Sequence, residues 1–166
     1  MPIAAEEKLK GEFYRLFQGE TGISAASDAE FEYTGQYDFA KIWSYQVPVN
    51  MELIILPDHR ASVYIEDDES SSAEWADNEW VRIAVWNPDL TTMQVIHEGR
   101  YLETKETADV EKMGFYNKVS EPVRIKAGGW IYVYGKCPFT IYTIDVSDSF
   151  FMLEMLRVRP SMFEAK

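Results

Sequence analysis

The chain has a single cysteine and two histidines, and it contains no long apolar run. A single thiol cannot form an intramolecular disulfide, and Cys137, just before Pro138, is expected to be a packed thiol at a strand end. His59 and His97 have no second histidine or cysteine at metal-ligand spacing, so the sequence predicts no metal site and no cofactor. No apolar stretch approaches the roughly 18 residues of a membrane-spanning helix, so we expect no membrane partner.

Motifs of common catalytic and phosphate-binding sites are missing as well. The sequence has no Gly-x-Ser-x-Gly elbow, no Gly-x-Gly-x-x-Gly fingerprint and no Gly-Lys-Ser/Thr loop. The pair Gly128-Gly129 is typical of a tight hairpin turn, which requires positive φ, and the pair His97-Glu98 is typical of a solvated strand end. The sequence therefore predicts that the chain is not an enzyme and has no catalytic residues.

Basic residues are scarce between positions 20 and 79. This segment holds fourteen acidic residues against only Lys41 and Arg60, a balance of −12 that equals the net charge of the whole chain. An acidic surface repels phosphate backbones, so we expect no nucleic-acid partner. The acidic run at 66–69 is open to two interpretations, a solvated loop or a calcium site, and its spacing favours the loop.

Near the start of the chain, four large apolar residues recur at i, i+4, i+7 and i+8: Leu9, Phe13, Leu16 and Phe17. This spacing predicts a short N-terminal helix with one apolar stripe, which begins near Pro2 and ends at Gly19. Small and polar residues at 19–30 predict a linker. We therefore expect an arm over residues 1–30 and a second domain over residues 31–166, and the helix can dock on either its own domain or a neighbour.

Beyond residue 30, short apolar segments alternate with turn residues. Ten candidate strands follow from this pattern: 31–37, 42–47, 49–56, 61–66, 79–86, 93–102, 122–126, 130–135, 139–146 and 150–158. Turn signals every 8–12 residues without helical periods favour an antiparallel fold over an α/β fold. Longer loops are expected at 67–78 and 104–117. The predicted fold class is all-β, a single antiparallel β-sandwich of jelly-roll-like type with a short N-terminal helical arm.

Several aromatic residues lie on the strand face opposite the aliphatic residues that are expected to form the core. Trp130, Tyr132 and Tyr134 share one face of a strand, and Ile131 and Val133 share the other, so neither face is typical of a solvated surface. Three further tryptophans flank the acidic segment or alternate with aliphatic residues: Trp75, Trp80 and Trp86. Such rings can pack beneath the helix or the loops, anchor a protein contact, or stack on sugar rings. The candidate interaction residues are Leu9, Phe13, Phe17, Trp75, Trp80, Trp86, Trp130, Tyr132 and Tyr134.

These features favour a non-enzymatic structural subunit that self-associates in a larger assembly, most similar in kind to a virion capsid or capsid-decoration protein. The expected partners are further copies of the chain, as a trimer before a dimer, and a larger protein shell. We expect synthesis in the cytoplasm and, for such an assembly, a place in the virion. The first alternative is a carbohydrate-binding β-sandwich module that uses exposed tryptophans, and the second is a small sandwich enzyme whose catalytic carboxylates the sequence does not place.

Overall fold

A computed structural model of the protein describes residues 11–17, 22–25, 39–67, 79–101, 114–116, 119–136 and 144–159. Within these ranges the regular structure is β-strand throughout. In chain order the strands are β1 (Glu12–Phe17), β2 (Ile23–Ala25), β3 (Ala40–Gln46), β4 (Glu52–Ile55), β5 (Arg60–Asp67), β6 (Glu79–Trp86), β7 (Met93–Tyr101), β8 (Gly114–Tyr116), β9 (Val123–Ile125), β10 (Trp130–Lys136) and β11 (Ile144–Val158).

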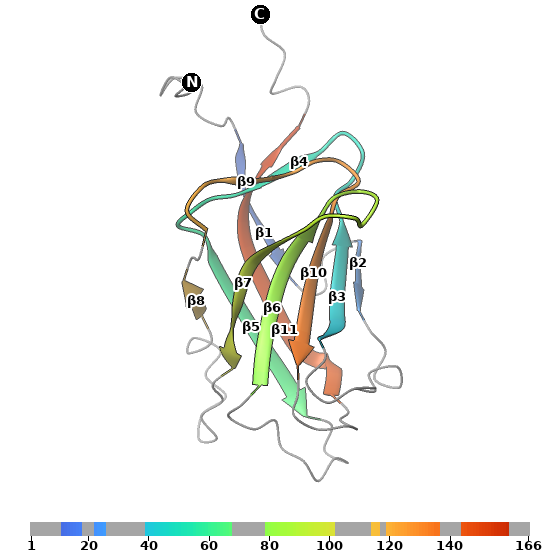
Figure 1. Cartoon of the computed structure of the whole chain (residues 1–166), viewed down its shortest axis with the longest axis vertical. Helices are drawn as coiled ribbons and strands as arrows, with labels where there is room; N and C mark the ends of the chain where they lie inside the picture. Colours follow the sequence, from blue (N-terminus) through green and yellow to red (C-terminus); the bar gives the residue numbers. More distant parts are fainter. Residues whose placement is uncertain are drawn as a thin grey trace, which may run out of the picture.

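The strands form two antiparallel sheets that lie one behind the other (Figure 1). In sheet A, β5 pairs with residues 144–153 of β11 and β4 pairs with residues 156–158, β8 and β9 extend the sheet from β5 and β4, and β1 pairs with residues 152–157 of β11. Sheet B has the order β2-β3-β10-β6-β7. The chain passes repeatedly from one sheet to the other, for example from β3 to β4 and from β9 to β10, as in jelly-roll folds. The predicted antiparallel β-sandwich of jelly-roll-like type is therefore confirmed.

Alternating side chains fill the space between the two sheets. Ile131 and Val133 of β10 point inward and are buried, as their period-two pattern predicts. The ring centroids of Trp43 in sheet B and Phe151 in sheet A lie 5.1 Å apart, and both side chains are fully buried. This contact joins the two layers at the centre of the core. Burial of large apolar side chains such as these is the main stabilising term, at about 1.5–3 kcal/mol per side chain.

The predicted N-terminal helix is wrong for the part of it that the structure describes. Residues 12–17 form strand β1, which pairs with β11 from Glu12↔Arg157 to Phe17↔Met152. Leu16 points into the core and is completely buried, whereas Phe13 and Phe17 point outward. The spacing of Phe13 and Phe17 fits both a helix stripe and one face of a strand, and pairing with β11 decides between them. Leu9 lies outside the described residues.

Three further predictions need correction. Residues 23–25, expected in a linker, form β2 and pair with β3, and residues 114–116, expected in a loop, form β8 and pair with β5. The expected turn at 147–149 is absent because β11 continues through it; a register shift between Asp145 and Phe150 absorbs the extra residues as an irregularity in the strand. The expected strand at 31–37 lies outside the described residues.

Other sequence predictions agree with the structure. The strands expected at 42–47, 61–66, 79–86, 93–102, 122–126 and 130–135 are confirmed to within two residues at each end. Gly128 has the positive φ, 82°, that the predicted turn requires. The turn is nevertheless not a hairpin, because it carries the chain from β9 in sheet A to β10 in sheet B. The division at residue 30 stays a prediction, although β1 and β2, which precede it, pair with later strands.

Candidate functional site

The outer face of sheet B carries a group of aromatic side chains in register. Across β3, β10, β6 and β7, three rows of directly opposed residues form this face: Gln46–Trp130–Trp86–Met93, Ser44–Tyr132–Ala84–Val95 and Lys41–Tyr134–Arg82–Glu98. Directly opposed residues of antiparallel strands share a face, so each row is a line of neighbours. We call Trp86, Trp130, Tyr132 and Tyr134 the aromatic face. The first two rows are mainly apolar, and the third is mainly charged.

Exposure supports this assignment to the outside of the sandwich. The four rings of the aromatic face are half-buried, whereas the alternate residues of β10 are fully buried in the core. Met93 and Val95 extend the apolar surface to the edge strand β7, and each is 37% exposed. Ala84 and Ser44 flank Tyr132 on the same face and are buried, because small side chains lie below the level of the surrounding rings. The outer face therefore presents a continuous apolar area.

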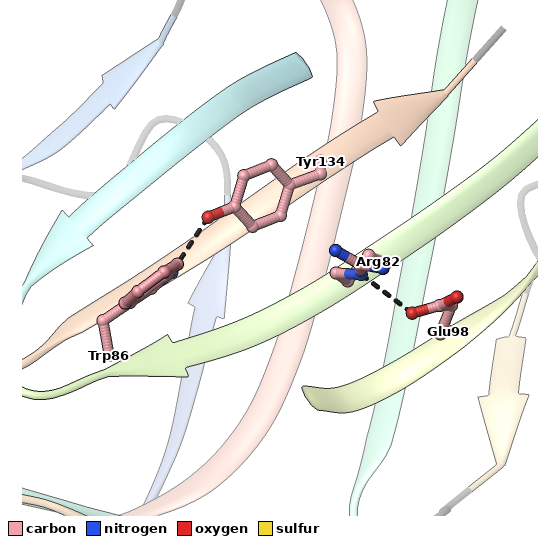
Figure 2. A network of polar contacts seen from close by, with 4 residues as sticks. All are labelled: Arg82, Trp86, Glu98 and Tyr134. Carbon is pink, nitrogen blue, oxygen red and sulfur yellow. Dashed lines mark hydrogen bonds and ion pairs between the residues drawn. The ribbon is translucent and has the colours of Figure 1, made fainter. Parts of the chain in front are cut away.

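The rings hold one another in place. Tyr132 lies centrally, with ring centroids 5.7 Å from Trp130, 5.8 Å from Tyr134 and 6.2 Å from Trp86. The Tyr132 ring is inclined by 62° to Trp130 and by 71° to Tyr134, which is the edge-to-face geometry that aromatic pairs favour. The Trp86 indole nitrogen donates a hydrogen bond of 2.9 Å to the Tyr134 hydroxyl (Figure 2). These contacts restrain the four rings relative to one another.

A charged margin borders the aromatic face at its third row. Figure 2 shows Arg82 directed at Glu98, with 2.8 Å between Nε and Oε2. The Arg82 guanidinium carbon also lies 3.7 Å from the centre of the Phe39 ring, and the Lys41 ammonium lies 4.7 Å from the centre of the Tyr132 ring. Cations that contact rings in this way gain a favourable electrostatic interaction. The charged side chains of this margin therefore form an ion pair at the surface and cation–π contacts with the neighbouring rings.

Burial shifts the pKa of the two tyrosines on the aromatic face. Desolvation raises the pKa of the Tyr132 hydroxyl above its usual value. Desolvation also raises the pKa of Tyr134, although the hydrogen bond from Trp86 acts in the opposite direction. Physiological pH lies well below even the ordinary tyrosine pKa of 10.0, so both hydroxyls are protonated and neutral there. The aromatic face offers hydrogen-bonding and apolar groups rather than an anionic one.

The predicted interaction residues fall into separate groups. Trp86, Trp130, Tyr132 and Tyr134 come together on sheet B, whereas Phe13 and Phe17 lie on the outer face of sheet A. Trp80 has its backbone opposite Arg100 of β7, and Trp75, like Leu9, lies outside the described residues. Sequence analysis missed Met93, Val95, Lys41 and Phe39 as neighbours of the rings. Period-two alternation in β7 places Met93 and Val95 on the same face of that strand. No local sequence pattern, however, predicts that β7 pairs with β6 beside the rings.

The two histidines lie apart from the aromatic face. His59 is buried in a turn, where its Nδ1 lies 2.8 Å from the carbonyl oxygen of Leu56. His97, expected at a solvated strand end, is buried, so that prediction is wrong; Glu98 next to it points outward to Arg82. Among the described residues no three histidine, cysteine or acidic side chains gather as metal ligands. The calcium interpretation of 66–69 stays open, because 68 and 69 lie outside these residues.

Among the residues that the structure describes, no helix is long and apolar enough to cross a bilayer.

Comparisons with known proteins identify the fold. No protein-family model and no curated protein matches the sequence. Among solved structures, the chain resembles VP17, a capsid protein of bacteriophage P23-77, with a TM-score of 0.58 and 6% identity over 90% of this chain and 96% of that one. It also resembles the VP16–VP17 complex of the two major capsid proteins of bacteriophage P23-77, with a TM-score of 0.54 and 6% identity over 90% of this chain and 100% of that one. At this identity the likeness shows a shared sandwich fold.

Proposed function

We propose that the chain is a non-enzymatic structural subunit of a virion shell, as a capsid protein or a capsid-decoration protein, and that the aromatic face of sheet B contacts a neighbouring subunit. The observation that carries the proposal is the set of interlocked, half-exposed rings on the outside of the sandwich. The fold likeness to phage capsid proteins supports the same function. Fold alone does not assign a function, so the surface has to carry the argument.

The arrangement of the face resembles the anatomy of a protein interface. Interfaces have an apolar, aromatic centre surrounded by a polar rim, and truncation of a central tryptophan or tyrosine commonly costs about 2 kcal/mol or more of binding. Here the rows of Trp130 and Tyr132 form the centre, and the Arg82–Glu98 pair forms part of the rim. Because the rings already pack against one another, they would lose less side-chain conformational entropy when a partner binds. The face is therefore suited to a preorganised contact.

The partner we infer is a second copy of the chain, within a closed cyclic assembly, and a trimer is favoured over a dimer. In a closed assembly, a neighbouring subunit covers each copy of the aromatic face. Large apolar patches on soluble proteins are usually covered in this way. In the shell, the assembled subunits would dock on a second protein. Synthesis in the cytoplasm and a final location in the virion belong to the same proposal.

A carbohydrate-binding module is the second candidate. A depression of about 430 Å³ lies beside Trp86 and is also lined by Gln94, Arg124 and Lys126, which offer polar groups to sugar hydroxyls. The steep mutual tilt of Trp130, Tyr132 and Tyr134 argues against it, because flat stacking of several sugar rings requires nearly coplanar aromatic faces. The protein contact is therefore preferred.

Native mass spectrometry and light scattering test the proposal. The parent protein should form a discrete oligomer at micromolar concentration, and the Trp130→Ser/Tyr132→Ser variant should be a monomer with an unchanged β-type circular dichroism spectrum. Val49→Ser is the control, because Val49 is 82% exposed, lies in the turn between β3 and β4, and belongs to none of the three rows of the aromatic face. This control should keep the parental oligomer.

Two outcomes would decide against the proposal. A parent that stays monomeric and docks on no shell would remove its basis, and so would a glycan array on which the parent binds a polysaccharide through Trp130 and Tyr132. If the double variant unfolds, Val95→Glu replaces it, because this side chain is on the same face and 37% exposed. An unchanged oligomer in Val95→Glu would then contradict the assignment of the face.

A further inference from the structure

The turn between β6 and β7 presents an exposed leucine in a backbone conformation that leucine rarely adopts. Leu90 has a φ of 58°, in the left-handed region that glycine and asparagine enter more readily. Its side chain is 43% exposed, and the neighbouring Asp89 is exposed as well. We call these two residues the turn tip. The local backbone does not account for a leucine at this position, and residues that break a local rule in this way often mark a contact.

Hydrogen bonds within the turn hold the tip in place. The Leu90 amide donates a hydrogen bond of 3.0 Å to the carbonyl oxygen of Asn87. The side-chain oxygen of Asn87 accepts hydrogen bonds of 2.8 Å from the amides of Thr91 and Thr92. The Asp89 carboxylate accepts a hydrogen bond of 2.7 Å from the Thr91 hydroxyl, which lowers the pKa of Asp89 below its usual 3.8. The tip is therefore an ordered pair of one anionic and one apolar side chain.

The depression of about 430 Å³ beside Trp86 has residues of both the β6–β7 turn and the β9–β10 turn in its lining. Figure 1 shows the two turns at the same end of the sandwich. They also lie against each other, because a Cβ added at Gly128 would be 3.5 Å from Pro88. The turn tip and the depression therefore occupy the same end of the molecule.

The lining of the depression has the opposite charge to the tip. Val85, Pro88 and Ile125 supply apolar surface, and Arg124 and Lys126 supply two exposed cations. Among the described residues that line the depression there is no carboxylate, although Glu52 pairs with Arg124 from outside it at 3.4 Å. The depression thus suits a ligand that combines an apolar group with an anion.

We propose that the turn tip of one copy inserts into the depression of the next copy, with Leu90 against the apolar lining and Asp89 beside Lys126. This inference rests on the proposed function and deepens it, because it names the segment that meets the neighbouring copy at the Trp86 end of the aromatic face. The tip and the depression are different patches of one surface. A contact between different patches closes into a ring when the rotation between subunits permits it.

Charge complementarity selects a second copy as the occupant. The chain carries a net charge of −12, so two copies repel each other over most of their surfaces. The cations of the depression attract the acidic tip instead, and such complementary patches determine the orientation in which two proteins meet. A depression of about 430 Å³ is within the range of about 300–1,000 Å³ that is typical of small-ligand sites, so it has room for two side chains. Every residue of the tip and of the lining belongs to the described part of the chain.

Substitution of the leucine separates the contact from the stability of the turn. Leu90→Asn removes the apolar side chain but keeps a residue that tolerates the left-handed conformation, so the melting temperature at low protein concentration should not fall. Association of the full chain should weaken at least about tenfold by analytical ultracentrifugation. Val49→Ser is the control, because Val49 is an 82% exposed apolar residue of another turn and does not line the depression. Unchanged association in Leu90→Asn, or an equal loss in the control, would overturn the proposal.

A double-mutant cycle tests the charged pair. Asp89→Asn removes the charge but keeps an oxygen that can accept the hydrogen bond from Thr91, and Lys126→Gln removes the opposite charge. Each variant should weaken association at least about threefold, and the double variant should lose no more than either single variant, because all three break the same pair. Losses that multiply in the double variant would overturn the pairing. The proposal would also fail if both variants kept the parental association while Lys126→Gln abolished binding of the parent to a polysaccharide, since the depression would then be a sugar site.

Failure of the tip contact can be told apart from failure of the proposed function. If the parent forms oligomers that depend on Trp130 and Tyr132 but Leu90→Asn leaves them unchanged, the tip contact is wrong and the shell function stands. If Leu90→Asn dissociates the oligomer while the aromatic variants leave association unchanged and no larger assembly forms, the tip contact stands and the shell function fails.

Discussion

The indole nitrogen of Trp86 donates a hydrogen bond of 2.9 Å to the hydroxyl of Tyr134, which lies four residues along β10 from Trp130, the residue directly opposite Trp86. The bond spans the aromatic face diagonally and passes beside Tyr132, whose ring contacts both partners. It joins β6 to β10 through side chains as well as through the backbone. The rings thus behave as one layer rather than as separate exposed side chains.

This relationship predicts coupling between the two residues. Tyr134→Phe should lower the free energy of unfolding by about 1 kcal/mol in the parent, the typical net value of one hydrogen bond. In a Trp86→Phe background the same substitution should cost close to nothing, because the donor is gone. Urea unfolding of the four proteins of this double-mutant cycle measures the difference. Equal costs in both backgrounds would show that the bond does not contribute in solution.

The two half-buried tyrosines of the aromatic face predict a loss of stability at alkaline pH. Burial raises the pKa of Tyr132 and Tyr134 in the folded protein above the ordinary value of 10.0. The unfolded chain therefore loses these protons first, so the stabilisation is fully present below the ordinary pKa and is lost as the pH rises through the folded pKa. Urea unfolding between about pH 9 and about pH 11 should show a steeper fall for the parent than for Tyr132→Phe/Tyr134→Phe. Parallel curves would contradict the shifts.

Period-two alternation was sufficient to predict much of the sandwich. Alternation places Ile131 and Val133 on one side of β10 and its aromatic rings on the other, so the sequence predicts both the core side and the aromatic side of that strand. The sequence does not predict which residues of neighbouring strands lie opposite one another, because register shifts determine the pairing. One shift lies between Val133 and Tyr134 against β3, and another lies between Ile83 and Ala84 against β7. Neither shift has a local sequence signature.

The wrong predictions for His97 and for the N-terminal helix have the same origin, long-range strand pairing. The shift in β7 inserts Ile96 between the partners of Ile83 and Ala84, so the adjacent residues Ile96 and His97 are both buried and simple alternation misplaces the histidine. At the N-terminus, Phe13 and Phe17 satisfy a helical and an extended pattern equally. Pairing with β11, some 140 residues away in sequence, decides for the strand. Local patterns predict faces, but long-range pairing determines which faces meet.

Two adjacent glycines predict unequal effects of the same substitution. At Gly128, Ala meets only ordinary contacts with Pro88, and its cost of about 1–2 kcal/mol comes from the positive φ of 82°. At Gly129 an added Cβ would lie 3.0 Å from the Lys126 carbonyl oxygen and 3.1 Å from that of Trp86, both backbone atoms that cannot easily move. Gly129→Ala should therefore lower the melting temperature more than Gly128→Ala. The reverse order would show that conformational strain outweighs close packing at this turn.

Strand β1 allows the core and the surface contributions of one element to be separated. Leu16 is completely buried, so Leu16→Ala should destabilise the fold by about 2–5 kcal/mol through lost burial and the cavity left behind. Phe13, three residues earlier, is 62% exposed, so Phe13→Ala should change the free energy of unfolding of the monomer by less than about 0.5 kcal/mol. Urea unfolding at a concentration below that needed for association measures both. Similar losses in the two variants would show that Phe13 is covered within one chain in solution, against its 62% exposure.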